Sequence, residues 1–94
     1  MRDPIELDSE RARLWARVGE LRRAVAELSD AYGALPASGL LIDTVGAGAL
    51  TTAGYCVAGA REVLEEALIE LVAAGDALDR AARYTARLRA VAFD

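Results

Sequence analysis

The chain has 94 residues, a formal net charge of −4 and 54 % apolar residues, with no histidine and no lysine. A domain of this size is near the lower limit for a self-sufficient core, and its negative charge argues against nonspecific binding to nucleic acid. We expect no membrane span, because no apolar run approaches ~20 residues, and the acidic start does not resemble a signal peptide, so the protein is expected to be cytoplasmic as synthesised.

The first predicted helix covers residues 8–33. Asp8 or Ser9 is expected to cap its N-terminus, and Gly33 with the following Pro36 is expected to end it. Leucine recurs every seven residues at heptad position d, and valine fills the later a positions. This regularity is typical of a helix packed against another helix. The stripe comprises Leu14, Val18, Leu21, Val25 and Leu28.

The connection is predicted over residues 34–50. It is long for a link between two helices, and it carries enough leucine, isoleucine and valine to fold back over the end of the hairpin. Its Gly-Ala-Gly segment at residues 46–48 lacks the third glycine of a dinucleotide-binding fingerprint, because Thr51 stands there. We therefore interpret these glycines as turn residues.

The second predicted helix covers residues 51–92. Its leucines at positions 64, 71 and 78 repeat every seven residues, with alanines repeating every seven between them. Alternating leucine and alanine permits close approach of an antiparallel helix. Glutamates near its start and arginines near its end agree with the helix dipole. We expect Leu64, Leu71 and Leu78 to face the stripe of the first helix.

Some apolar residues remain outside that internal seam, notably Trp15, Leu68 and Val72. A two-helix hairpin has one internal interface, so a second apolar surface predicts a second contact. The expected fold is therefore all-α: one domain, residues 1–94, forming an antiparallel two-helix hairpin that assembles into a four-helix bundle. The expected partner is a second copy, giving a homodimer, or a similar helical hairpin, giving a heterodimer.

Catalytic chemistry is not indicated. Serine or cysteine catalysis needs a base such as histidine, di-iron bundles need histidine as a ligand, and the chain has no histidine. We expect no enzyme activity, no cofactor, no metal and no small-molecule substrate, and we interpret Glu62, Glu66 and Glu70 as a solvated face. Cys56 is expected to be a small buried hydrophobe, which could cross-link a dimer if it were exposed.

Three short segments carry a family resemblance. Residues 35–38 read Leu-Pro-Ala-Ser, residues 45–50 form a Gly/Ala-rich entry to the second helix, and residues 74–78 are followed by Tyr84. With two long helices in about one hundred residues, the chain resembles small actinobacterial proteins of type VII (ESX) secretion, and most closely their EspC-like group. The resemblance implies a helical hairpin that is a substrate or partner of such a system, exported without a cleavable signal.

Two hallmarks of the related Trp-x-Gly proteins are not matched. The only tryptophan, Trp15, lies inside the first predicted helix, and Tyr84 is followed four residues later by Leu88 where the export signal has an acid. Two other functions stay open. One is a small regulatory or antitoxin-like partner of a neighbouring gene product. The other is an all-α enzyme similar to chorismate mutase, for which only Arg11 stands at a core position.

Overall fold

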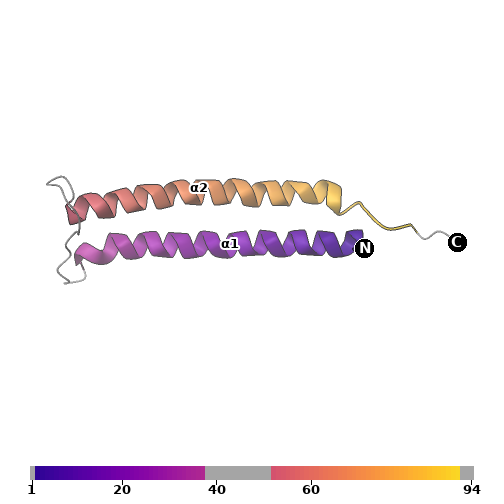
Figure 1. Ribbon diagram of the computed structural model, residues 1–94, viewed down its shortest axis with the longest axis horizontal. Helices are drawn as coiled ribbons and strands as arrows, with labels where there is room; N and C mark the ends of the chain where they lie inside the picture. Colours follow the sequence, from indigo (N-terminus) through magenta and orange to yellow (C-terminus); the bar gives the residue numbers. More distant parts are fainter. Residues whose placement is uncertain (1, 38–51, 92–94) are drawn as a thin grey trace. The chain divides into compact units, whose positions relative to one another are not determined.

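The computed structural model describes residues 2–37 and 52–91. The long helices are α1 (Pro4–Ala34) and α2 (Ala53–Thr85), the short 3-10 helix η1 (Leu35–Ala37) follows α1, and the described residues contain no strand (Figure 1). The predicted all-α helical hairpin is confirmed. Most of the predicted connection lies outside the described residues.

The chain divides into two compact units. The terminal unit comprises Met1–Arg22 and Glu70–Asp94, and the central unit comprises Arg23–Ile69. Each unit therefore contains one stretch of α1 and one stretch of α2, and each is described by itself.

Helix α1 begins at Pro4, four residues before the predicted start at Asp8. The cap is Asp3, whose Oδ1 accepts a hydrogen bond of 2.7 Å from the main-chain N–H of Ile5. Proline suits the first helical position because its missing N–H has no partner there, and Glu6 adds a negative charge to the first turn. Asp8 therefore does not cap the helix, and its side chain contacts Thr85 of the second long helix instead.

Gly33 does not act as a left-handed C-cap. It lies inside α1, one residue before Ala34, and its backbone is not in the left-handed region. A Cβ placed on Gly33 would approach the guanidinium of Arg61 to 2.7 Å. The glycine therefore makes room for a side chain from α2 in the central unit.

Helix α2 begins after Thr52, whose Oγ1 accepts a hydrogen bond of 3.1 Å from the N–H of Tyr55. It ends at Thr85, seven residues before the predicted Ala92. After Thr85 two main-chain hydrogen bonds tighten to an i→i+3 pattern, from Arg87 to Tyr84 and from Leu88 to Thr85. The described residues after this turn, up to Val91, are not helical.

Contacts within the terminal unit show that α1 and α2 run antiparallel there. In the terminal unit Asp8 contacts Thr85, whereas Val18, further along α1, lies opposite Gly75. In the central unit Arg61 of α2 reaches Ser29 and Asp30 of α1.

The hairpin has no apolar core of its own among the described residues. The buried residues are Ser29, which is 4 % exposed, and Gly75, and no apolar side chain is buried. Burial of apolar surface is the main favourable term in folding, so the two helices alone gain little of it.

Candidate interaction surface

The structure separates the predicted interface residues into two groups. Those that are partly buried are Val18, Val25, Leu64, Leu68, Leu71 and Leu78. Those that are exposed are Leu14, Trp15, Leu21, Leu28 and Val72. In the first group Val18 lies close to Gly75 of α2, and the second group lies on solvent-facing surface.

The exposed leucines share heptad position d of α1. The sequence pattern predicts positions a and d as the seam of the hairpin, but the described residues that are shielded in α1 include Val18 and Val25 at position a and Ser29 at position e. Ser29, at position e, is buried, whereas Leu28, at position d, is 47 % exposed. In the terminal unit Leu14 and Leu21 are exposed in the same way. Ser29 has a small side chain and Gly75 has none, and these are the buried positions of the described residues, whereas the bulkier d leucines lie on the flank.

A polar cluster links α1 to α2 in the terminal unit. Arg11 Nε donates a hydrogen bond of 2.8 Å to Asp8 Oδ1, and Arg11 Nη1 donates one of 3.2 Å to the carbonyl oxygen of Leu78. Thr85 Oγ1 donates a hydrogen bond of 2.6 Å to the same Asp8 oxygen. The side chains of Arg11 and Asp8 are 17 % and 27 % exposed, so this ion pair is better shielded than the surface pairs of the chain.

The cluster also changes the acidity of Asp8. The hydrogen bond from Arg11 is the main cause of a lowered Asp8 pKa, and the hydrogen bond from Thr85 and the positive charge of Arg11 act in the same direction. Desolvation opposes them without reversing the shift. Asp8 is therefore held as a carboxylate that accepts two hydrogen bonds from this cluster.

Sequence reasoning missed this cluster, although one signal was present. Asp8 and Arg11 stand three residues apart, which places them on one face of a helix, and Arg11 occupies an a position in an otherwise apolar stripe. No sequence signal identified Thr85, whose contact depends on the register of α2 against α1.

The central unit has a weaker polar contact. Arg61 Nε lies 3.5 Å from Ser29 Oγ, and Arg61 Nη2 lies 4.0 Å from Asp30 Oδ1. Asp30 is largely exposed, so the ion pair contributes little to stability. The contact gives the buried Ser29 hydroxyl a partner.

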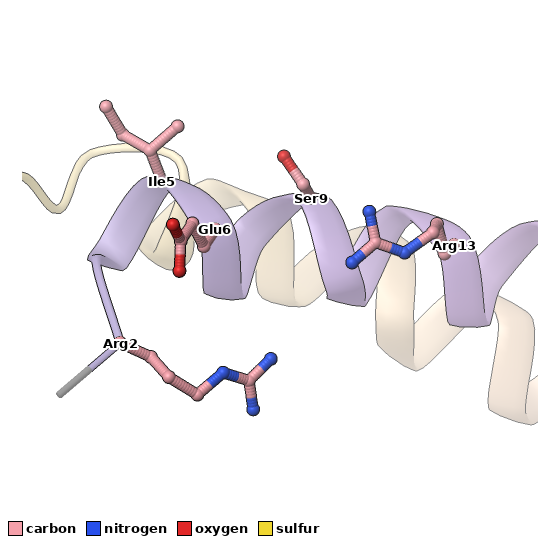
Figure 2. A pocket seen from close by; sticks show the side chains of 5 residues that line it. All are labelled: Arg2, Ile5, Glu6, Ser9 and Arg13. Carbon is pink, nitrogen blue, oxygen red and sulfur yellow. The ribbon is translucent and has the colours of Figure 1, made fainter.

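An open depression lies along the first turns of α1 in the terminal unit (Figure 2). Its lining residues are Arg2, Ile5, Glu6, Ser9 and Arg13. All five come from one short stretch of chain, so no second element of the described part of the chain lines the depression. The Arg2 guanidinium forms an ion pair with Glu10 at the surface. This arrangement has no shielded centre at which a substrate could be separated from water.

No group of three or more His, Cys, Asp or Glu side chains within the described ranges is arranged to hold a metal ion. Cys56 is a free thiol and is exposed, so the expectation that it is a buried hydrophobe is wrong. Neither α1 nor α2 combines the length and the apolar character needed to cross a membrane.

Comparison of the chain with protein-family models, with curated proteins and with solved structures found no match. The resemblance to type VII secretion proteins therefore stays a prediction from the sequence.

Proposed function

We propose that this chain is a non-enzymatic interaction protein whose hairpin completes its apolar core against another helical hairpin. The observation that carries the proposal is that no apolar side chain is buried in the described part of the chain, while several large ones are exposed in each unit. Trp15, Leu14 and Leu21 are exposed in the terminal unit, and Val63 and Ile69 in the central unit.

The physical reason is the balance between chain entropy and burial. Ordering a residue costs about 1–2 kcal/mol in backbone entropy alone, and apolar burial is the main term that offsets this cost. Helices in proteins gain most of their stability from packing of an apolar face against another element. A second hairpin laid against the exposed side chains would supply that packing and form a four-helix bundle.

The same proposal includes a biological setting. We place the chain among the substrates or partners of a type VII secretion system, on the strength of the segments at residues 35–38, 45–50 and 74–78. A long helical hairpin with an exposed apolar surface is compatible with that setting. Co-expression with the products of neighbouring genes tests it: a stable one-to-one complex with a second helical hairpin supports this setting, and failure to find one contradicts it.

The solution mass of the purified chain tests the interaction proposal itself. Light scattering coupled to size-exclusion chromatography should give a species of about 20 kDa, which is twice the chain mass of 9.9 kDa, with high helicity by circular dichroism. A chain that needs a different hairpin should be poorly helical alone and become helical in the complex. A fully helical 9.9 kDa monomer at every concentration would contradict the proposal.

A further inference from the structure

We infer that the leucine row of the terminal unit, Leu7, Leu14 and Leu21, binds the same row of a second copy of this chain, with the two α1 helices antiparallel about Leu14. The inference rests on the proposed function, because it names the occupant of an exposed surface and the geometry of its binding. It uses residues of the terminal unit alone.

The row has the geometry of a helix-packing surface. Its members are spaced by seven residues, so they lie along one face of α1, and they are 46 %, 43 % and 53 % exposed. In this unit Arg11 and Val18, at position a, are partly buried, whereas the leucine row stays exposed. A second helix packed on three leucines at heptad spacing removes their apolar surface from water, which is favourable.

The charges that flank the row indicate which helix covers it. Glu10 and Arg17 occupy position g, next to the leucines on the side away from the internal seam. In an antiparallel pair centred on Leu14, Glu10 of one copy lies within one residue of the level of Arg17 of the other, and two-fold symmetry repeats this pair. In an in-register parallel pair, Glu10 would lie level with Glu10 of the other copy and Arg17 with Arg17, so like charges would be level with each other. Charge complementarity therefore favours a second copy in the antiparallel arrangement.

Both charged groups are accessible for such a contact. Arg17 is exposed and has no ion-pair partner within the described ranges. Glu10 pairs with Arg2, but the Glu10 side chain stays 42 % exposed, so its carboxylate can accept a second cation. Surface pairs of this kind select orientation more than they add affinity.

Disulfide cross-linking tests the arrangement directly. Cys56 is first replaced by alanine, and single cysteines are then introduced as Leu14→Cys, Leu7→Cys or Leu21→Cys. Of the three variants, we expect only Leu14→Cys to form a covalent dimer with itself, because the two-fold axis brings the two copies of residue 14 together. Leu7→Cys and Leu21→Cys should each stay monomeric on a non-reducing gel, whereas a mixture of the two should cross-link. Self-cross-linking at all three positions would indicate a parallel pair and overturn the inference.

A charge exchange provides a second test that needs no cysteine. Glu10→Arg alone and Arg17→Glu alone should each raise the dissociation constant of the dimer about threefold or more, because like charges become opposed. The double variant should return it close to the original value. Glu20→Arg is the matched control, since Glu20 is an exposed acid of the same unit that does not flank the row.

The outcomes separate this inference from the proposed function. A dimer that neither cross-links through Leu14→Cys nor responds to the charge exchange overturns the leucine-row geometry and leaves the interaction proposal standing. If the chain binds a different hairpin and never a second copy of itself, the leucine-row geometry is likewise overturned and the interaction proposal stands. A helical monomer at every concentration overturns both.

Discussion

Arg11 of α1 donates a hydrogen bond of 3.2 Å from Nη1 to the main-chain carbonyl oxygen of Leu78 in α2. The same guanidinium holds Asp8 through Nε, so one side chain links both helices of the terminal unit. Arg11 stands at a heptad position that an apolar residue would usually fill. A polar group at such a position tends to fix register at some cost in stability, and Arg11 has the geometry for that role.

Removing the Arg11 side chain should destabilise the terminal unit. Arg11→Ala leaves Asp8 and the Leu78 carbonyl with fewer partners, so we expect the free energy of unfolding to fall by about 1–2 kcal/mol. Arg13→Ala is the control, because Arg13 is exposed on the same helix and forms no ion pair within the described ranges. Urea unfolding followed by circular dichroism measures both variants. Equal effects would show that the Arg11 contacts contribute nothing specific.

Stability should depend on pH through Asp8. Its pKa is lowered in the folded chain, chiefly by the hydrogen bond from Arg11, so its contribution is fully present above the unfolded value of about 3.9. The contribution is lost as the pH falls through the lower folded pKa. We expect the stability difference between wild type and Asp8→Asn to be largest near neutral pH and to shrink below about pH 4.

The measurement is a series of urea unfolding curves from about pH 7 to about pH 2. Asp76→Asn is the matched control, since it removes an exposed carboxylate of the same unit outside the Arg11 cluster. A constant difference between wild type and Asp8→Asn across the series would refute the assigned role of Asp8.

Gly75→Ala should stabilise the hairpin. Alanine favours the helix interior over glycine by about 1 kcal/mol. The new Cβ would lie 3.6 Å from Val18 Cγ1, which is an ordinary van der Waals contact. Gly59→Ala is the control, because a Cβ there meets no atom within 4 Å and gains from helix propensity alone. A loss of stability confined to Gly75→Ala in thermal unfolding would mean that the helices approach more closely than the structure indicates.

Gly33 and Arg61 should be energetically coupled in the central unit. A Cβ on Gly33 would lie 2.7 Å from Arg61 Nη1, so the guanidinium must move away from Ser29 to admit it. We expect Gly33→Ala to stabilise the Arg61→Ala variant more than it stabilises the wild type, by about 0.5 kcal/mol. A double-mutant cycle of unfolding free energies measures the difference, and a coupling of zero would contradict the contact.

The fold was largely predictable from the sequence because heptad leucines and valines identify long helices whatever they pack against. The helix ends were harder. A recognisable N-terminal signal is present at Asp3, Pro4 and Glu6, and the helix begins at Pro4, four residues before the start predicted at Asp8. The end of α2 at Thr85 has no such signal, because good helix formers such as alanine and arginine follow it in the sequence.

The interface residues were only partly predictable. A heptad pattern identifies an apolar face but does not say which partner each position meets. Val18 and Val25 are partly buried, whereas Leu14, Leu21 and Leu28 remain exposed. The buried positions of the described residues are Ser29 and Gly75, and neither residue is apolar enough to signal a seam.

The most direct test of the central claim is thermal unfolding of the unmodified chain over about a hundredfold range of protein concentration, followed by circular dichroism. If the core is completed between chains, folding and association are coupled and the Tm should rise steadily with concentration. A Tm independent of concentration, for a chain that light scattering shows to be a monomer, would mean that the hairpin is stable without a partner.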